Sequence, residues 1–290
     1  FEFVKNLFHE ADEELNFPIS KLIFDGPKEL LDLTENTQPA IFLVSYSIFN
    51  VIKKETKLDI NDAKFFAGHS LGEYTALVCA GSITLERAAY LLHERGKAMQ
   101  NAVPIGRGSM IAILGNKIDD IKNLIDSRKN KDGVCEIAND NAEGQVIISG
   151  DKESINSFQT ELKQKKIKFL PLKVSAPFHC SLMKPAADIM KEKINKIDFK
   201  TPKYPIVNNV NALPETDPAK IKDLLYEQIF STVRWRESLI NISKNGISDF
   251  IEIGPGKVLS GMVKRTLKNA NSFSINSITD INNLINEFKK

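Results

Sequence analysis

The heptapeptide GHSLGEY, Gly68–Tyr74, contains a GxSxG motif where a short apolar segment gives way to a helical pattern. In a nucleophile elbow, glycines relieve crowding in a strained strand-to-helix turn that lifts the serine clear of the backbone. The amide that follows the serine then points at the oxyanion developing on the substrate. The motif predicts Ser70 as a nucleophile and the Leu71 amide as an oxyanion donor. A tight turn without catalytic function is the alternative.

A serine nucleophile needs a base, and the chain offers four histidines. His69 adjoins the serine, where a side chain usually points away from the nucleophile, so we expect a packing or supporting role. His9 and His93 fall on polar parts of predicted helices, and we expect His93 to be solvated. His179 follows a predicted strand and a turn, a setting in which α/β sheets hold catalytic groups. We therefore expect His179 to be the base, against the alternative of a purely structural histidine.

The third member of a triad is not evident. Between Ser70 and His179, the order expected of a serine hydrolase, the aspartates fall on polar helix faces or in turns, and none follows a strand. Two interpretations stay open. Either a backbone carbonyl orients the imidazole, or the protein is not an ordinary hydrolase.

Arg95 indicates the kind of substrate. It lies on the inward apolar stripe of its predicted helix, with Leu91, Leu92 and Met99, and not on the charged face. A buried guanidinium needs an anion, and its planar fork suits a carboxylate. The sequence therefore predicts either a carboxylate-binding site or a structural ion pair with a distant acid.

Strand-like and helix-like segments alternate around these residues, which favours an α/β fold with a parallel sheet and helices on both faces. The middle of the chain follows the order βαββαβ, which is typical of a ferredoxin-like subdomain inserted into a larger unit. The cleft between the two parts is the expected site. In the larger part we expect a buried helix over Ala40–Ile52, strands over Ala63–Gly68 and Ser248–Gly254, and helices over Glu73–Gly81, Thr84–Val103 and Val258–Asn269. In the subdomain we expect strands over Ser109–Gly115, Val134–Asp140, Gln145–Asp151 and Ile167–Val174, and helices over Lys117–Asn130 and Lys152–Lys166.

Composition excludes several classes of function. The 290 residues carry 39 Lys and Arg against 37 Asp and Glu, so the net charge of +2 provides no field for nucleic acid or an anionic membrane. The longest apolar run is too short to span a bilayer. Three scattered cysteines form no CxxC pair, and the histidines have no metal-ligand spacing, so we expect no structural metal and a reducing, cytoplasmic location.

Several segments together resemble the malonyl-CoA:acyl-carrier-protein transacylases of bacterial-type fatty acid synthesis. They are TQPA, GHSLGEY, LLHERGKAMQ, GRGSM, ANDNAEGQVIISG, SAPFHCSLMKPAAD and FIEIGPGKVLSGMVKRT, in family order across nearly the whole chain. The resemblance implies an α/β-hydrolase-like domain over residues 1–105 and 176–290, interrupted by a ferredoxin-like subdomain over residues 106–175.

The resemblance also implies roles for individual residues. Ser70 would be acylated by malonyl-CoA, His179 would be its base, and Arg95 would bind the malonyl carboxylate. The main-chain carbonyl of Gln228 would orient the histidine in place of an acid. The other implied residues border the cleft or the acyl pocket: Asn141 and Gln145 in the subdomain, and Met99 and Phe178 beside the acyl group.

One departure from the family concerns the start of the chain. Members open with a strand and a glycine-glutamine-glycine loop whose glutamine contributes to the oxyanion hole, and this sequence begins at Phe1, after that segment. We expect a truncated or missing N-terminal segment. The Leu71 amide is then the one oxyanion donor that the sequence identifies.

The implied reaction moves a malonyl group from malonyl-CoA to Ser70 and then to the phosphopantetheine thiol of acyl carrier protein, with no cofactor. Two alternatives stay open: a serine esterase or thioesterase, and a non-catalytic fragment that binds carrier protein. Because carrier proteins of this pathway are acidic, we expect docking on a local basic surface. Its residues would be Lys264, Arg265 and Lys268 of the predicted helix after GPGK, Lys257 at the start of that helix, and Lys184 beside the His179 loop. A solvated helix face is the alternative.

Overall fold

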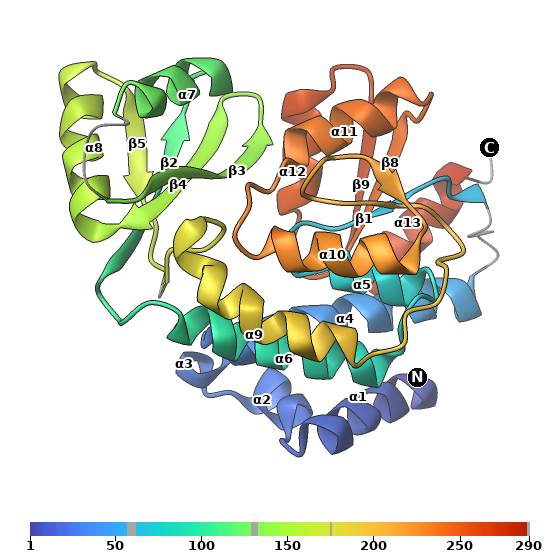
Figure 1. Ribbon diagram of the computed structural model, residues 1–290. Helices are drawn as coiled ribbons and strands as arrows, with labels where there is room; N and C mark the ends of the chain where they lie inside the picture. The colour runs from blue at the N-terminus through green and yellow to red at the C-terminus, as the bar shows by residue number, and fades with distance from the viewer. Residues whose placement is uncertain (57–61, 129–132, 175, 289–290) are drawn as a thin grey trace.

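The computed structural model describes residues 1–56, 62–128, 133–174 and 176–288 (Figure 1). It is a mixed α/β structure with two parts, a larger one that contains both ends of the chain and a smaller one built from its middle. The N-terminal helices are α1 (Glu2–Leu15), α2 (Ile19–Asp25), α3 (Lys28–Leu31) and α4 (Thr34–Glu55).

Helix α4 is the buried helix expected from the apolar run, extended at both ends. It packs mainly on helix α6 (Leu85–Asn101), and its side chains Phe42, Leu43, Phe49 and Ile52 are at most 5% exposed. In the described parts of the chain, no helix is both long enough and apolar enough to cross a membrane.

The elbow region follows the predicted strand-to-helix order, but its strand is short. Strand β1 spans Phe66–Ala67, where we expected Ala63–Gly68, and helix α5 (Gly72–Cys79) follows directly. Thr84 caps helix α6, because its hydroxyl accepts from the Arg87 amide. Strand β1 and helix α5 thus hold the GxSxG turn between them.

The expected parallel sheet of the larger part is divided. Strand β1 pairs in parallel with β6 (Ile206–Val207), which pairs antiparallel with β7 (Pro214–Glu215). A second sheet joins β8 (Asp249–Ile253) and β9 (Asn271–Ile275) in parallel. The described strands of this part therefore form two short sheets, one of them mixed, and the expectation of one parallel sheet is wrong in this respect. The remaining helices here are η2 (Ser181–Met183), α9 (Lys184–Asn195), α10 (Pro218–Gln228), α11 (Trp235–Lys244), α12 (Val258–Thr266) and α13 (Ile278–Phe288).

The smaller part is one antiparallel sheet with two helices. Its elements are β2 (Gly108–Leu114), α7 (Ile118–Asp126), β3 (Cys135–Ala142), β4 (Gln145–Asp151), α8 (Lys152–Gln164) and β5 (Lys168–Pro171), and the strand order is β3-β4-β2-β5. Strand β5 ends three residues before the expected Val174. The last two residues of the helix expected over Lys117–Asn130, and the expected subdomain end at position 175, lie outside the described residues.

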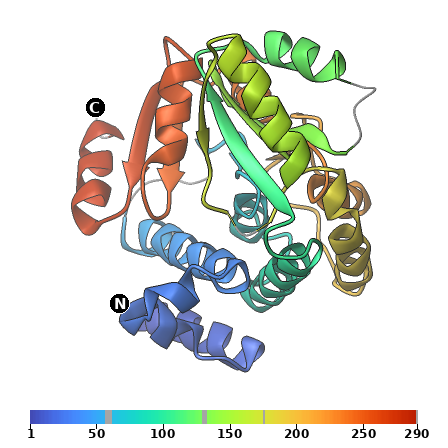
Figure 2. The same cartoon turned by 90° about the vertical axis from the view of Figure 1, so that its left-hand side faces the viewer.

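The period-2 pattern of β2 explains how this sheet packs. Ile111 and Ile113 face helices α7 and α8 in one apolar cluster, whereas Met110 and Ala112 join a second cluster that includes Phe178 of the larger part. Figure 2 shows helix α8 on the face of the sheet that points away from the larger part. The opposite face of the sheet therefore packs toward the larger part and its predicted site.

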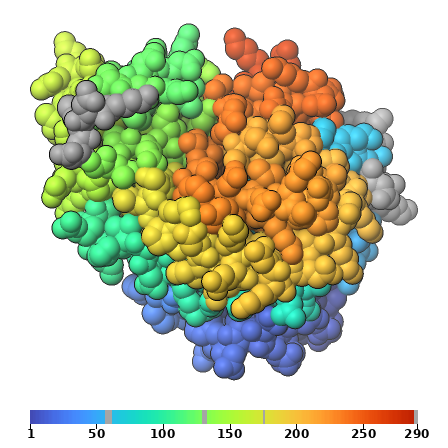
Figure 3. Space-filling model, viewed as in Figure 1, coloured from blue at the N-terminus to red at the C-terminus, as the bar shows by residue number. Residues whose placement is uncertain are grey.

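Polar contacts also join the two parts. The Arg236 guanidinium donates to both carboxylate oxygens of Asp140 at 2.9 and 3.0 Å, and Glu136 accepts from the Ser181 amide at 2.8 Å. In the space-filling view, a notch at the top separates the two surfaces (Figure 3). These contacts fix the relative position of the walls of the cleft.

Candidate active site

The GxSxG turn has the geometry of a nucleophile elbow. Ser70 adopts φ 52°, a left-handed conformation that costs a non-glycine residue about 1–3 kcal/mol. A Cβ on Gly68 would lie 1.9 Å from the Gly72 carbonyl oxygen, so this position requires glycine. A Cβ on Gly72 would meet nothing within 4 Å. Only the first glycine relieves crowding, and the expectation that both do so is wrong.

Ser70 and His179 are in direct contact. The Ser70 Oγ lies 2.8 Å from His179 Nε2, and His179 Nδ1 lies 2.8 Å from the main-chain oxygen of Gln228. The carbonyl accepts the Nδ1–H, which leaves the Nε2 lone pair to accept the hydroxyl proton. The contact that the family resemblance implied for Gln228 is present, and it occupies the place of a triad acid.

His179 reaches this position by a different route from the one expected. Strand β5 ends at Pro171 and belongs to the antiparallel sheet, so His179 does not follow a strand of a parallel sheet. It lies just before η2 and α9, whose apolar stripe of Met183, Ala187 and Met190 is fully buried. Burial, reinforced by the Arg95 charge, lowers the pKa of His179 to about 3. The imidazole is therefore neutral and able to accept a proton.

Arg95 is buried beside the nucleophile, as its helical phase predicted. Its side chain is 1% exposed, and its Nη2 donates to Ser70 Oγ at 3.0 Å and to Gln228 Oε1 at 2.9 Å. Nη1 donates to Gln38 Oε1 at 2.6 Å, whereas Nε has no partner in the described residues. Burial lowers the pKa of Arg95. The described hydrogen-bond partners of this cation are neutral acceptors, and the Glu73 charge acts on it without a direct ion pair. The structural ion pair, the alternative to carboxylate binding, is therefore absent from the described residues.

Two residues that the sequence did not single out complete the surroundings of Ser70. Glu73, 1% exposed, accepts from Gln228 Nε2 at 2.8 Å and from the Asn209 amide at 3.0 Å. Asn209, fully buried, accepts from the Ser70 amide at 2.7 Å and donates to the Gly68 oxygen at 2.9 Å. A charged residue three positions after the nucleophile, in the first turn of an apolar helix, was the available signal for Glu73. Asn209 had none.

The other predicted residues differ in their surroundings. Within the described residues, the Leu71 amide has no hydrogen-bond acceptor, as an oxyanion donor requires. Met99 is buried in the main core, and Phe178 is half-buried and packs against both parts. Asn141 Oδ1 lies 2.8 Å from His69 Nε2 and forms no described hydrogen bond with Ser70 or His179. Gln145 accepts from Arg265 at 3.1 Å.

The remaining histidines are placed as follows. His69 packs edge-on against Trp235 and binds Asn141, which agrees with a supporting role. His93 is only partly exposed to solvent, because its Nδ1 lies 2.9 Å from the main-chain oxygen of Glu35 and its ring stacks on Phe17. In the described residues, no group of three or more His, Cys, Asp or Glu side chains is arranged to hold a metal ion.

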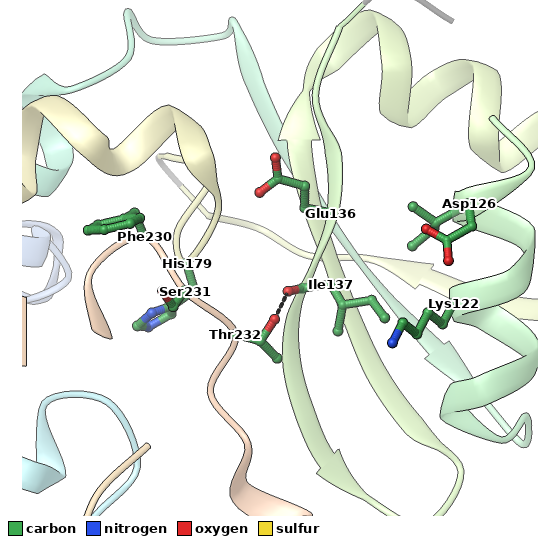
Figure 4. A pocket seen from close by; sticks show the side chains of 9 residues that line it. Lys122, Asp126, Glu136, Ile137, His179, Phe230, Ser231 and Thr232 are labelled. Atoms are coloured by element: carbon green, nitrogen blue, oxygen red, sulfur yellow. Dashed lines mark hydrogen bonds between the residues drawn. The ribbon is translucent and has the colours of Figure 1, made fainter. Parts of the chain in front are cut away.

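A cavity of about 410 Å³ opens onto His179 from between the two parts. Figure 4 shows its walls: Phe230, Ser231 and Thr232 follow α10 on one side, and Lys122 of α7 lies on the other. The dashed line joins Thr232 Oγ1 to the Ile137 oxygen of β3, a further bond between the two parts. His179 thus lines a cavity between the two parts.

Comparison with known proteins identifies the family. The family model described as the acyl transferase domain matches residues 5–285. This chain belongs to the acyl transferase family. The malonyl CoA-acyl carrier protein transacylase of Bacillus subtilis is 40% identical to this acyl transferase over 287 residues, covering 99% of the chain and 89% of the relative. That of Salmonella typhimurium is 40% identical over 278 residues, covering 95% and 88%.

Solved structures agree with this assignment. The acyl-carrier-protein S-malonyltransferase of Bartonella henselae superposes on this acyl transferase with a TM-score of 0.95 at 39% identity, covering 100% of the chain and 92% of the other. A malonyl-transacylase in complex with its type II polyketide acyl carrier protein gives a TM-score of 0.93 at 36% identity, covering 99% and 92%. The resemblance inferred from the motifs is confirmed.

Proposed function

We propose that this acyl transferase moves a malonyl group from malonyl-CoA to the phosphopantetheine thiol of acyl carrier protein through an ester on Ser70. The observation that carries the proposal is the 3.0 Å contact between Arg95 Nη2 and Ser70 Oγ. The described hydrogen-bond partners of this buried guanidinium are neutral, its Nε has no partner among the described residues, and it contacts the nucleophile directly. These features match an acyl group that ends in a carboxylate.

The first half-reaction follows from the contacts of Ser70. His179 Nε2 takes the hydroxyl proton while Ser70 Oγ forms a bond to the thioester carbon, and the Leu71 amide stabilises the resulting oxyanion. The carbon–sulfur bond then breaks, and His179 returns the proton to the departing CoA sulfur. The Gln228 carbonyl keeps the Nδ1–H in place, so the imidazole holds the tautomer that both steps need.

The second half-reaction runs the same steps with another thiol. The pantetheine sulfur of the carrier protein gives its proton to His179 and attacks the ester carbon. The bond from that carbon to Ser70 Oγ breaks, and the proton returns to the serine. The cavity that His179 lines together with Phe230 and Thr232 supports this ping-pong order, because CoA and carrier protein end in the same kind of flexible arm and one opening would serve both.

Three further assignments belong to the same proposal. We place the acyltransferase domain at residues 1–105 and 176–290, with an α/β-hydrolase-like architecture, and the ferredoxin-like subdomain at residues 106–175. The strand order β3-β4-β2-β5 supports the second designation. We also place the protein in the cytoplasm, which the free thiols of Cys79, Cys135 and Cys180 support.

The test is mass spectrometry of the protein after exposure to labelled malonyl-CoA, followed by addition of carrier protein bearing phosphopantetheine. We expect one malonyl group on the peptide that contains Ser70 and its subsequent appearance on the carrier protein. Release of free malonate at the same rate with and without carrier protein would indicate a thioesterase. Binding of carrier protein with no adduct on Ser70 would indicate a non-catalytic fragment.

A further inference from the structure

Glu73 is a buried carboxylate to which the reaction assigns no step. It lies in the first turn of α5, three residues after the nucleophile, and its side chain is 1% exposed. Within residues 1–56, 62–128, 133–174 and 176–288 it forms no ion pair, and burial raises its pKa to about 7 despite the hydrogen bonds that it accepts. Burying such a group costs free energy, and the hydrogen bonds that it accepts offset part of that cost. The position of those hydrogen bonds indicates what the carboxylate does.

One oxygen of Glu73 ties together two segments that are distant in sequence. Glu73 Oε2 accepts from Gln228 Nε2 at the end of α10 and from the Asn209 amide after β6. Both partners are at most 2% exposed, so water cannot replace this oxygen without rearrangement of the site. The carboxylate therefore joins α5, α10 and the segment after β6, three residues along the chain from Ser70.

The contact with Gln228 fixes the direction of its side-chain amide. Gln228 Nε2 faces three acceptors: Glu73 Oε2, the main-chain oxygen of Ser70 at 3.0 Å and Asn209 Oδ1 at 3.3 Å. Its Oε1 is consequently turned toward Arg95 Nη2. The reversed amide would set its NH2 group against the guanidinium, two donors facing each other. Through Gln228, Glu73 thus holds Arg95 against Ser70.

The contact with Asn209 fixes the elbow. The Asn209 side chain joins the Gly68 oxygen to the Ser70 amide, and so spans the turn in which Ser70 takes its positive φ. Glu73 accepts from the Asn209 amide and so holds the Asn209 backbone where its side chain can bond to both the Gly68 oxygen and the Ser70 amide. A strained turn persists only where its surroundings over-determine it, and this bond is part of that restraint.

We propose that Glu73 is a positioning residue for acyl transfer: one carboxylate oxygen holds Gln228 and Asn209 so that the elbow, Arg95 and His179 converge on Ser70 Oγ. The part of this inference that concerns Arg95 rests on the proposed malonyl specificity. The role needs an acceptor oxygen at the correct distance and does not need the charge. Glutamine can supply that oxygen, whereas aspartate is one methylene too short and alanine has no acceptor.

The experiment compares Glu73→Ala, Glu73→Asp and Glu73→Gln with a matched control, Ser82→Ala. Ser82 is equally buried and donates to the Lys200 oxygen, so its replacement removes an internal hydrogen bond outside the site. The first measurement is the ratio of kcat/KM for malonyl-CoA to that for acetyl-CoA. The second is the rate at which a neutral sulfonyl fluoride modifies Ser70, which depends on the elbow and His179 but on neither acyl group.

We expect Glu73→Ala and Glu73→Asp to lower the malonyl-to-acetyl ratio and the rate of sulfonylation, each by about 10- to 100-fold, since misplacement of a reacting group by about 1 Å costs that much. Glu73→Gln should keep both values within about threefold of the wild type. A merely structural role would lower the amount of active protein and leave the ratio unchanged, as in Ser82→Ala, and that result overturns the inference.

The two measurements also separate this inference from the proposed function. If the wild type makes no malonyl adduct, the proposed function fails, while sulfonylation still reports whether Glu73 positions the elbow. If Glu73→Ala does not fold, Glu73→Asp gives the same comparison with the carboxylate retained. Equal rates of sulfonylation in the wild type and in whichever of these two variants folds would refute the positioning role, whatever the acyl specificity.

Discussion

The polar cluster around Ser70 and the apolar core of the smaller part are equally buried but are built from opposite kinds of residue. In the core, Ile111, Ile148 and Phe158 are fully buried and belong to neighbouring elements of one subdomain. In the cluster, the side chains of Glu73, Arg95, His179, Asn209 and Gln228 are at most 5% exposed and come from five separate segments. The core of the smaller part buries apolar side chains, whereas the cluster around Ser70 buries hydrogen-bonding groups.

The two regions contribute different properties to the protein. An apolar core gains free energy with area and tolerates substitutions that conserve volume, so it stabilises the wall of the cleft without fixing any atom of the chemistry. A buried polar cluster stabilises little, because desolvation offsets its bonds, but each group has only one arrangement that satisfies it. Changes in the cluster should therefore alter reactivity, and changes in the core should alter stability.

The largest effect should come from the nucleophile itself. Ser70→Ala removes the atom to which the acyl group is attached, so we expect no malonyl adduct and no transfer to carrier protein. Intact-protein mass spectrometry measures this directly, and urea unfolding should show a fold as stable as that of the wild type. A malonyl ester on another residue of the variant would show that the nucleophile is wrongly assigned.

Replacement of Arg95 should change selectivity rather than reactivity in general. Arg95→Ala removes the cation facing the acyl carboxylate, and we expect the loss of about 3–5 kcal/mol in malonyl transfer that accompanies removal of a buried charged partner. Acetyl transfer should change far less. Steady-state kinetics with both CoA esters measures the ratio, and Arg95→Lys should restore it only in part because lysine lacks the fork. Equal losses with both esters would contradict carboxylate binding.

A substitution in the apolar core should have the opposite signature. Phe158→Ala removes a fully buried ring from α8, and we expect the free energy of unfolding to fall by about 3–5 kcal/mol. Phe24→Ala, at a position that is 72% exposed, is the matched control and should cost about 1 kcal/mol or less. Urea titration measures both.

The rate of Ser70 acylation per folded molecule should stay the same in the Phe158→Ala variant. A selective loss of the malonyl-to-acetyl ratio in Phe158→Ala would break the distinction between the two regions.

The two regions also differ in how much of them the sequence predicts. The core follows from alternation, because the period-2 pattern of β2 and the apolar stripes of α7 and α8 assign each residue to a face. The chemistry of Ser70 and the inward face of Arg95 also follow from local pattern. Asn209 and Glu73 do not, since their roles depend on segments that meet only in the folded chain. The divided sheet was missed for a similar reason: strands of two residues, such as β1 and β6, have no measurable period.

The low pKa of His179 predicts a smaller effect, namely that the reactivity of Ser70 does not fall as the pH drops through 6.5. Burial and the Arg95 charge lower its pKa from 6.5 to about 3, so the neutral base persists as the pH falls through 6.5. We expect sulfonylation of Ser70 to keep its rate from about pH 8 down to about pH 5.5. Glu73 protonates near pH 7 but retains an acceptor oxygen, so it should add no acidic limb.

The lowered pKa of His179 also makes the free energy of unfolding depend on pH. Because unfolded histidine binds a proton at 6.5 and folded His179 only near 3, stability linked to this group is present above pH 6.5 and is lost as the pH falls toward 3. In Arg95→Ala the neighbouring charge is gone, so the pKa of His179 should rise. The pH at which the rate of Ser70 sulfonylation begins to fall should rise with it. A limb with an apparent pKa near 6.5 in the wild type would mean that His179 is solvated.

The smallest expected effect lies on the surface, outside both regions. Lys264 and Arg265 are exposed on α12, and Arg265 donates to Gln145 at the start of β4. Lys268 is exposed just beyond the helix, which ends at Thr266 and not at the expected Asn269. If the acidic carrier protein docks here, Lys264→Glu combined with Lys268→Glu should slow transfer from acylated Ser70 to carrier protein about three- to tenfold at low salt, and flatten its salt dependence. This pair leaves the bond between Arg265 and Gln145 intact. Acylation by malonyl-CoA should change much less.

A matched control distinguishes a docking surface from a general effect of charge. Lys5→Glu combined with Lys21→Glu alters the net charge by the same amount on α1 and α2, at the opposite end of the molecule from α12 (Figure 1). Rapid mixing of acylated protein with carrier protein separates the second half-reaction from the first. Loss confined to the variant of Lys264 and Lys268 places docking at the C-terminal end of α12, because a long-range field would respond equally to both pairs. Equal rates in the two variants and the wild type would instead mean that Lys264 and Lys268 form an ordinary solvated face.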